Sequence, residues 1–454
     1  MRIHILGICG TFMGGLALLA KAAGHVVEGS DANVYPPMSV QLEAHGILLH
    51  EGYAAEHIDN NVDCVIIGNV VSRGNPAVEY VLSQQIPYLS GPEWLAKYVL
   101  KDKWVLAVAG THGKTTTSSL LAHILDQAGF EPGFLIGGVP ENFGVSARLG
   151  EGEYFVIEAD EYDSAFFDKR AKFMHYHPKT LILNNLEFDH ADIYANLAAI
   201  QQQFHYLVRT VPNNGLLVVN KTDSVLHEVL RKGYWTPLNY FGQDGDMTGE
   251  MTAATGQQFT VHCNNESRVV DWHLLGEHNM MNALASLLAA QHVGISLTTA
   301  TNALTSFKNV KRRLELKSSH NGIDVYDDFA HHPTAIAATI NALRAKIGQR
   351  RLIAILEFGS YTMKTGVHKH AIKDALQAAD IIVCKQSPVD WGLEEVLAMC
   401  AQSTFILPNV DAILLFLQSN LQPQDVVLVM SNTGFEGIHH KIDELFLTQA
   451  IDFN

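Results

Sequence analysis

Short apolar runs alternate with longer segments of helical periodicity along most of the 454 residues of this chain. The clearest example is residues 105–109, five consecutive small or branched apolar residues of the kind found in buried parallel strands. A turn rich in glycine and threonine follows, and leucine and isoleucine then recur at helical spacing from Ser118 to Gly129. This repeated order of strand, turn and helix predicts an α/β protein with parallel sheets.

The first hundred residues have the pattern of a Rossmann-like domain. Strands are predicted at residues 2–7, 26–31, 64–67 and 87–90. The first strand leads through glycines into a helix that should end near Ala23. A dinucleotide-binding fingerprint requires glycines at positions 7, 9 and 12, but Cys9 and Phe12 occupy two of them. A nicotinamide-dependent oxidoreductase is therefore a weak alternative. The glycines at the helix start are better explained by binding of another phosphate group or by tight packing.

The turn after residues 105–109 reads Gly-Thr-His-Gly-Lys-Thr-Thr-Thr. A glycine loop between a buried strand and a helix presents backbone N–H groups to phosphates. Its lysine reaches the outer phosphates, and the next hydroxyl can contact Mg²⁺. The usual pattern also has a glycine where Val108 stands, so this loop is a shortened variant. We predict a site for the triphosphate of a nucleotide, formed by Gly110, Thr111, His112, Gly113, Lys114, Thr115 and Thr116.

Acidic residues and a histidine follow the next two predicted strands, residues 154–161 and 180–185. Ligands of open α/β sheets bind at the carboxyl ends of the strands, so Glu158 and His190 are candidate metal ligands. Each has a simpler explanation, a solvated strand end for Glu158 and an ordinary loop histidine for His190. The neighbouring nucleotide loop favours the metal site.

The following segments are less uniform. Residues 243–270 turn polar and predict a small β excursion without an identifiable role. A helix is predicted over residues 275–290, and its first turn carries His278, Asn279 and Asn282. Amides three residues apart share a helix face and could contact a nucleotide base, although Asn279 could equally be an N-cap.

Helices and strands alternate again after a basic segment, Lys308 to Arg313, and predict a second doubly wound parallel sheet. The predicted helices cover residues 334–347, 368–379, 392–401 and 411–418, with a last helix from about residue 437. The predicted strands are 351–358, 381–384, 404–407 and 425–430. The histidine pairs at 331–332 and 439–440 lack the spaced cysteine or histidine partners of a zinc site, so no zinc is predicted.

Composition narrows the class of protein. The net charge of −16 argues against a nucleic-acid or anionic-membrane surface, so any anionic substrate needs locally placed cations and helix N-termini. The five cysteines show no paired spacing, which fits a reducing compartment. No run approaches the ~18 apolar residues of a membrane helix. We therefore expect a cytoplasmic protein that binds neither nucleic acid nor membranes.

Six sequence blocks, in order, resemble the Mur ligase family, the ATP-dependent amide-forming enzymes of bacterial cell-wall synthesis. They are Gly110-Thr-His-Gly-Lys-Thr-Thr-Thr117, Glu158-Ala-Asp-Glu161, Asn185-Leu-Glu-Phe-Asp-His190, Gly276-Glu-His-Asn279, Arg312-Arg313 and Asp328-Phe-Ala-His-His-Pro333. Their spacing is family-like, and the resemblance extends over essentially the whole chain. It implies a three-domain architecture.

The resemblance implies a role for each domain. Residues 1–103 would be a Rossmann-like domain that binds a UDP-sugar, residues 104–313 a central P-loop ATPase domain, and residues 314–454 a doubly wound domain that binds the amine and closes on ATP. Catalysis would rest on Lys114, Glu158, His190 and Arg313. The nucleotide would also contact His278, Asn279, Asn282, Arg313 and Asp328. Some members carry a carbamylated lysine, which this chain lacks, so the metal ligands would be Thr115, Glu158 and His190.

The resemblance also implies a reaction and its substrates. The lactyl carboxylate of UDP-N-acetylmuramate would attack the γ-phosphate of ATP, and an amine would then displace phosphate from the acyl phosphate. The sugar nucleotide would contact Cys9, Gly10, Thr11, Phe12, Met13, Gly14, Asp31 and Asn69. The amine would contact Thr362, Lys364, Ser431 and Asn432.

Two amines remain open at this point, free L-alanine and the recycled murein tripeptide L-alanyl-γ-D-glutamyl-meso-diaminopimelate. Residues 29–38, 357–366 and 430–438 resemble the tripeptide-adding members. However, Phe358, Gly359 and Tyr361 replace a proline, an arginine and an asparagine of the usual pattern. If that arginine holds a peptide carboxylate in relatives, another residue must do so here.

Overall fold

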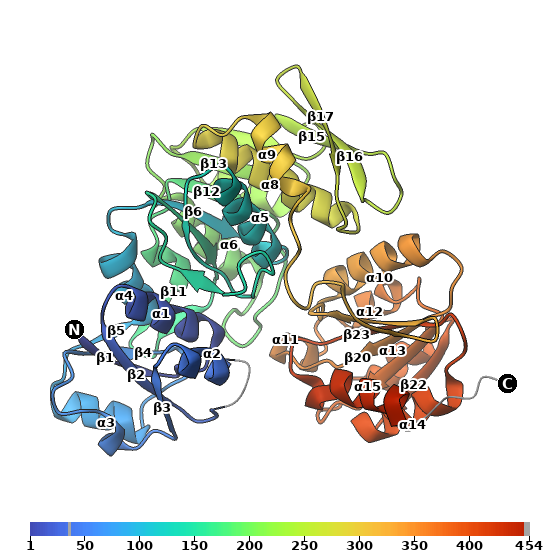
Figure 1. The fold of residues 1–454 in the computed structure, drawn as a ribbon, viewed down its shortest axis with the longest axis horizontal. Coiled ribbons are helices and arrows are strands. Elements are labelled where there is room, and N and C mark those ends of the chain that lie inside the picture. The colour runs from blue at the N-terminus through green and yellow to red at the C-terminus, as the bar shows by residue number, and fades with distance from the viewer. Residues whose placement is uncertain (35–37, 449–454) are drawn as a thin grey trace.

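Three sheets, each with its own helices, follow one another along the chain (Figure 1). The structure is a computed structural model that describes residues 1–34 and 38–448. Part of the predicted tripeptide-type segment, residues 35–37, therefore lies outside the described residues, as does the end of the chain. In Figure 1 the first sheet is blue, the central sheet runs from light blue through green to yellow-green, and the third sheet is orange to red.

The first sheet has five parallel strands in the order β3-β2-β1-β4-β5, as a Rossmann-like pattern predicts. Its strands are β1 (Arg2–Leu6), β2 (Val26–Asp31), β3 (Leu48–Glu51), β4 (Cys64–Ile67) and β5 (Tyr88–Ser90). Its helices are α1 (Thr11–Ala22), α2 (Met38–Ala44), α3 (Pro76–Ser83) and α4 (Gly91–Leu95), with short turns at Ala55–His57 and Ala96–Leu100.

Helix α1 also packs against the central sheet, near β7 (Gly133–Leu135) and β8 (Ala147–Arg148). The approach is close at Gly15, because an added Cβ there would lie 2.4 Å from Leu135 Cδ1. Glycine at this position therefore brings the start of α1 toward the second domain.

The central sheet has ten strands in the order β17-β16-β15-β14-β13-β12-β6-β9-β7-β8. Beyond β7 and β8 they are β6 (Trp104–Ala109), β9 (Tyr154–Ala159), β12 (Thr180–Leu183), β13 (Leu216–Asn220), β14 (Leu238–Phe241), β15 (Met247–Met251), β16 (Gln258–Cys263) and β17 (Glu266–Asp271). Its helices are α5 (Lys114–Gln127), α6 (Leu197–Val208), α7 (Ser224–Arg231), α8 (Glu277–His292) and α9 (Leu297–Leu304). A hairpin, β10 (Asp163–Ala165) and β11 (Asp168–Ala171), leads into a short 3₁₀ turn, Lys172–His175.

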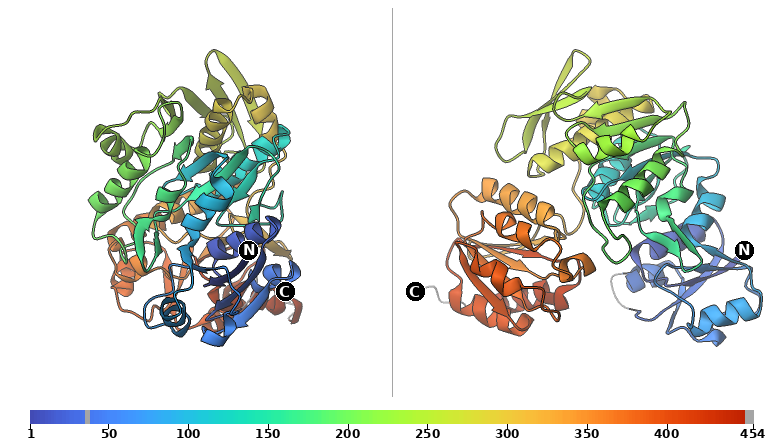
Figure 2. Two further views of the ribbon diagram at one scale, coloured as in Figure 1. Left: turned by 90° about the vertical axis from the view of Figure 1, so that its left-hand side faces the viewer. Right: turned by 180° about the vertical axis from the view of Figure 1, so that it is seen from behind.

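Two features of the central sheet bear on the predictions. The β excursion is confirmed, but it extends the central sheet: β15 joins parallel to β14, β16 and β17 continue as antiparallel strands, and all three project from the sheet in Figures 1 and 2. The helix predicted from Ser118 begins four residues earlier, so Lys114, Thr115 and Thr116 form its first turn. It ends at Gln127, and Gly129 follows in a left-handed conformation, as predicted.

The third sheet has six strands in the order β18-β19-β23-β20-β21-β22. They are β18 (Glu315–His320), β19 (Ile323–Asp328), β20 (Leu352–Leu356), β21 (Ile381–Lys385), β22 (Ser403–Leu407) and β23 (Val426–Met430). The helices are α10 (Pro333–Ile347), α11 (Tyr361–Lys364), α12 (Lys369–Ala375), α13 (Leu393–Ala398), α14 (Val410–Asn420) and α15 (Ile438–Thr448), with a short turn at Phe435–Gly437.

The prediction of a purely parallel third sheet was wrong at one edge. Strand β18 pairs antiparallel with β19, whereas the other pairs of this sheet are parallel. The polar sequence of β18 hid it, because its side chains alternate between half-buried and exposed positions at the edge of the sheet. Among the described residues, no helix has the length and apolar character needed to cross a bilayer.

Candidate active site

The glycine loop between β6 and α5 folds as predicted. Gly113 caps α5 with a φ of 78°, and a Cβ there would lie 2.4 Å from Asn282 Oδ1. Residues that follow β12 form hydrogen bonds to the loop and hold it in place. His112 N–H donates to Asn185 Oδ1 over 2.7 Å, and Thr111 Oγ1 accepts from Glu187 N–H over 2.9 Å. The loop is therefore preformed, and its helix N-terminus favours an anion.

We expect Gly113→Ala to weaken ATP binding and to lower the free energy of unfolding by about 2–4 kcal/mol. The left-handed backbone costs alanine about 1 kcal/mol, and the clash with Asn282 adds about 1–3 kcal/mol. Gly129→Ala is the matched control, because Gly129 has a φ of 81° and open space around its Cβ position. Equal losses of stability and of ATP affinity in the two variants, measured by thermal unfolding and ATP titration, would show that the contact with Asn282 is unimportant.

Lys114 lies in a cluster of carboxylates. Its Nζ is 3.1 Å from Glu161 Oε2 and 3.4 Å from Asp160 Oδ1, and the side chain is buried. Burial opposes the charged form, but Glu161, Asp160 and Glu158 outweigh it and hold the pKa of Lys114 above its ordinary value. The lysine is thus a fixed positive charge at the start of α5.

Thr115 and Glu158 meet as the sequence predicted for two ligands of one metal. Thr115 Oγ1 donates to Glu158 Oε1 over 3.0 Å, and Gly137 N–H donates to Glu158 Oε2 over 2.7 Å. Burial, followed by repulsion from Asp160, raises the pKa of Glu158. The hydroxyl oxygen of Thr115 and the carboxylate oxygens of Glu158, with the negative charge of Asp160 nearby, suit a hard divalent cation such as Mg²⁺.

His190 is placed differently from the prediction. Its Nε2 lies 3.0 Å from Glu161 Oε1, and no contact joins it to Glu158 in the described residues. The sequence placed the two after consecutive predicted strands, but β9 and β12 lie on opposite sides of β6 in the sheet. Burial opposes protonation of His190, but the hydrogen bond with Glu161 and the negative charges of Glu161 and Asp189 together outweigh it and raise the pKa of the imidazole. Glu161, which was missing from the candidate residues, therefore connects Lys114 to His190.

We expect Glu158→Gln and His190→Ala each to raise the Mg²⁺ concentration needed for half-maximal activity, by about 10-fold or more. Binding of the UDP-sugar should change much less, because neither side chain touches the first domain in the described residues. Activity titrated with Mg²⁺, alongside calorimetric titration with the sugar nucleotide, measures both effects. Superimposable Mg²⁺ curves for wild type and both variants would remove these residues from the metal site.

The asparagines of α8 make hydrogen bonds to other residues of the protein in this site. Asn282 accepts a hydrogen bond from Thr117 Oγ1 over 3.1 Å and donates to Asn279 Oδ1 over 3.2 Å. Asn279 Nδ2 donates to Leu275 O over 2.8 Å. Gly276 rather than Asn279 is the N-cap of α8, so the capping alternative was wrong. Their predicted contact with the base stays a prediction. His278 has a pKa lowered to about 4 by burial and by Arg313, so it is neutral near pH 7.

The segment between the central and third sheets reaches back to the nucleotide loop. Arg313 Nη2 donates to Thr115 Oγ1 over 3.3 Å. Buried Asp328 holds this segment in place by accepting from Leu314 N–H and Ala330 N–H, each over 2.7 Å. Arg312 turns the other way and donates to Ser431 O over 2.6 Å. Arg313 therefore reaches the nucleotide loop, and Asp328 orients the segment that carries it; their contacts with the nucleotide stay a prediction.

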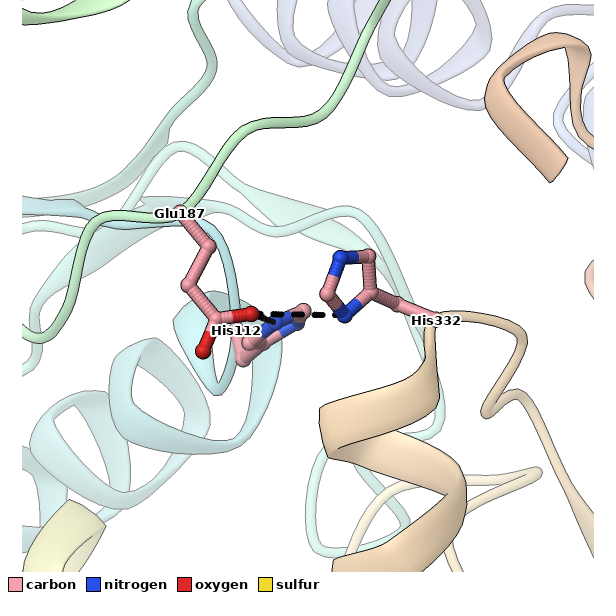
Figure 3. Close-up of side chains that lie close together, drawn as sticks. All are labelled: His112, Glu187 and His332. Carbon is pink, nitrogen blue, oxygen red and sulfur yellow. Dashed lines mark hydrogen bonds and ion pairs between the residues drawn. The ribbon is translucent and has the colours of Figure 1, made fainter. Parts of the chain in front are cut away.

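A second group of metal-capable side chains bridges the two sheets (Figure 3). His112 Nε2 and His332 Nδ1 lie 3.1 Å and 3.3 Å from Glu187 Oε2, and Thr334 Oγ1 donates to the same carboxylate. The three candidate ligand atoms lie within 4.8 Å of one another and could hold a cation. No sequence motif indicates this group, because its members are 75 and 145 residues apart along the chain. In the structure they fasten the start of α10 to the nucleotide loop.

Comparison with known proteins adds the family. Residues 2–102 match the description "Mur ligase family, catalytic domain", residues 108–290 "Mur ligase middle domain", and residues 312–433 "Mur ligase, glutamate ligase domain". A ligase of Escherichia coli named for UDP-N-acetylmuramate and L-alanyl-γ-D-glutamyl-meso-2,6-diaminoheptandioate is 54% identical, over 97% of each chain. The chain belongs to the Mur ligase family.

Two further Mur ligases are informative. The crystal structure of a murein peptide ligase from Psychrobacter arcticus has 45% sequence identity and a TM-score of 0.77, covering 98% of both chains. A UDP-N-acetylmuramate–L-alanine ligase from Dictyoglomus turgidum is 33% identical over 84% of this chain and 81% of its own. The identity is thus higher to the relatives named for a peptide than to the one named for alanine.

In this Mur ligase the predicted sugar-nucleotide residues surround the start of α1. They are Cys9, Gly10, Thr11, Phe12, Met13 and Gly14, with Asp31 at the end of β2 and Asn69 just after β4. Cys9 N–H donates to Asp31 Oδ2 over 2.8 Å, and the first turn of α1 has neither a side-chain cap nor an acidic residue. An uncapped helix start of this kind is available to an anion.

The predicted amine residues occupy the loops after β20 and β23, which are neighbours in the third sheet. Thr362 is buried against the His190 loop, where its Oγ1 accepts from Ala191 N–H over 3.1 Å. Ser431 donates to Glu357 Oε2 over 2.8 Å. Asn432 Oδ1 is buried without a hydrogen-bond partner. Lys364 makes no ion pair or hydrogen bond through its ammonium among the described residues.

The position of the usual arginine is closely surrounded in this structure. A Cβ at Gly359 would lie 2.8 Å from Asn432 Oδ1 and 2.6 Å from Thr433 Cγ2, so a side chain there would require these two side chains to shift. Phe358, in place of proline, is buried and packs edge-on against Trp391. Lys385 is already paired with Glu357 and Glu436, whereas the Lys364 ammonium has no such partner within residues 1–34 and 38–448.

Proposed function

We propose that this chain is an ATP-dependent ligase that joins UDP-N-acetylmuramate to L-alanyl-γ-D-glutamyl-meso-diaminopimelate and so recycles murein peptide into peptidoglycan precursor. The observation that carries the proposal is the 54% identity, over 97% of both chains, to the relative named for these substrates. The alternative amine is free L-alanine, supported by a relative that is 33% identical. A nicotinamide oxidoreductase would leave the nucleotide loop without a role.

The three domains take separate parts in this proposal. Residues 1–103 bind the UDP-sugar at the start of α1, residues 104–313 bind ATP, and residues 314–454 present the amine. Arg313, at the join, contacts Thr115 and is supported by Asp328. Because the contacts of Thr362, Thr334 and His332 with the central domain surround the same site, closure of the third domain shields it from water.

The chain's own residues favour transfer of the γ-phosphoryl group to the lactyl carboxylate. Lys114 places a fixed positive charge where the outer phosphates of ATP meet the loop, and thereby reduces repulsion between two anions. Thr115 and Glu158 would hold one Mg²⁺ and His190 a second. When bound, these ions would neutralise charge on the phosphoryl oxygens. The amine then attacks the carbonyl carbon of the acyl phosphate, and phosphate leaves.

Phosphate release provides the direct test of this proposal. Purified protein should release phosphate from ATP only when UDP-N-acetylmuramate, Mg²⁺ and the tripeptide are all present, at one phosphate for each amide formed. A protein that only binds nucleotide would release none under these conditions. Release of phosphate without amide formation would contradict the ligase assignment.

A further inference from the structure

A buried lysine that the mechanism does not use lies between the first and central domains. Lys172, the first residue of the turn after β11, is 8% exposed. Its Nζ lies 5.0 Å from the ring centroid of Phe12 and 5.6 Å from that of Tyr162. Among the described residues its ammonium makes no ion pair and no hydrogen bond. A buried cation without a hydrogen-bonded partner is costly, so it points to a missing anion.

The nearby carboxylates do not supply that anion. Asp160, Glu161 and Asp163 attract the Lys172 ammonium electrostatically, without an ion pair or hydrogen bond among the described residues. Each of the three has another cation close by. Asp160 and Glu161 pair with Lys114. Asp163 pairs with Lys169 over 2.6 Å. Burial outweighs their attraction and lowers the pKa of Lys172.

The position of Phe12 shows from which side the anion would come. Phe12 lies in the first turn of α1, where the helix start has neither a side-chain cap nor an acidic residue. Two independent features, an uncapped helix N-terminus and an unpaired buried lysine, therefore face one region between the domains. Both favour negative charge. The hairpin β10–β11, which leads directly into Lys172, belongs to the central part of the chain, so the site has contributions from both sides.

We propose that Lys172 is a substrate-binding residue that contacts an acidic group of the sugar nucleotide and joins the start of α1 to the central domain in a single anion site. The inference rests on the proposed function, because it takes the UDP-sugar as the ligand. Two groups of that substrate have the required chemistry, the diphosphate and the lactyl carboxylate. In either case the ligand couples the first domain to the domain that binds ATP.

Three ligands and two variants test this inference by calorimetric titration. UDP carries the diphosphate alone, UDP-N-acetylglucosamine adds the sugar, and UDP-N-acetylmuramate adds the carboxylate. Lys172→Met should weaken UDP-N-acetylmuramate about 10- to 100-fold and leave ATP binding unchanged, whereas Lys172→Arg should retain most of the affinity. Lys169→Met is the control, because Lys169 is an exposed lysine of the same hairpin.

The pattern of losses identifies the group that is bound. Similar losses for all three ligands would support contact with the diphosphate, and a loss confined to UDP-N-acetylmuramate would support contact with the carboxylate. Affinities within twofold of wild type for all three ligands would overturn the inference. A wild-type protein that fails to bind UDP-N-acetylmuramate would instead refute the proposed function.

Thermal unfolding separates ligand binding from a structural role. Because Lys172→Met removes a buried charge that lacks a partner, the Tm of the ligand-free protein should be unchanged or higher. The increase in Tm on adding UDP-N-acetylmuramate should be smaller than in wild type. A lower Tm with an unchanged ligand-induced increase would also overturn the inference. If Lys172→Met does not fold, Lys172→Gln is measured in the same way and judged by the same criteria.

Discussion

Lys114→Ala is expected to lower kcat by about 10²- to 10³-fold, which corresponds to about 3–4 kcal/mol of lost transition-state stabilisation. The reason is the position of the ammonium in the first turn of α5, buried and held by Glu161 and Asp160. The substitution leaves Arg313 at the loop, through its contact with Thr115, but it removes the charge held beside Glu161 and Asp160 at the start of α5. Stopped assays of amide formation at saturating ATP measure the effect.

Two controls isolate this charge. Lys101→Ala removes an exposed lysine three residues before β6 and should leave kcat unchanged. The Kd for UDP-N-acetylmuramate in Lys114→Ala should also stay close to the wild-type value, because the sugar nucleotide is expected on the first domain. A Lys114→Ala enzyme with nearly normal turnover would show that this loop is not the phosphate site.

The second large effect concerns the amine. Lys364→Ala should raise the KM for the tripeptide about 10- to 100-fold, while the KM for ATP and for the UDP-sugar stays nearly constant. Lys364 follows β20 in α11, next to Thr362, which touches the His190 loop. Among the described residues its ammonium has no partner, and it lies five residues after Gly359, which replaces the usual arginine. A charge-assisted hydrogen bond to a peptide carboxylate would account for the loss.

Lys373→Ala serves as the matched control for Lys364→Ala, because Lys373 is an exposed lysine on the neighbouring helix α12. It should leave every KM unchanged. If Lys364→Ala behaves like this control, Lys364 is an ordinary solvated lysine, and another group must hold the peptide carboxylates. The amide oxygen of Asn432 cannot be that group, because it carries no positive charge.

The sequence predicted those parts of the fold in which local pattern and packing agree. The run of apolar residues before Gly110 became β6, buried at the middle of its sheet, and the glycine loop led directly into α5. Edge strands carry a weaker signal. Strand β18 was missed because its residues are polar and half exposed, and it is held mainly by backbone pairing with β19.

The sequence predicted individual residues of the candidate site but not all of the contacts between them. Lys114, Thr115 and Glu158 belong to local motifs, and the structure brings them together. The pair of Glu161 with His190 and the bridge of His332 to Glu187 depend on which strand ends are neighbours, which the sequence does not show. Lys172 has no motif at all. Its position became meaningful only when the structure placed it against Phe12 without an anionic partner.

The most direct test of the account is a competition between the two amines. Purified protein is given ATP, Mg²⁺, UDP-N-acetylmuramate and equal concentrations of free L-alanine and L-alanyl-γ-D-glutamyl-meso-diaminopimelate, and the products are quantified by mass spectrometry. The account predicts that the UDP-N-acetylmuramoyl-tripeptide forms in large excess over the UDP-N-acetylmuramoyl-L-alanine. A predominant alanine product would contradict it and would identify the chain as an L-alanine-adding ligase.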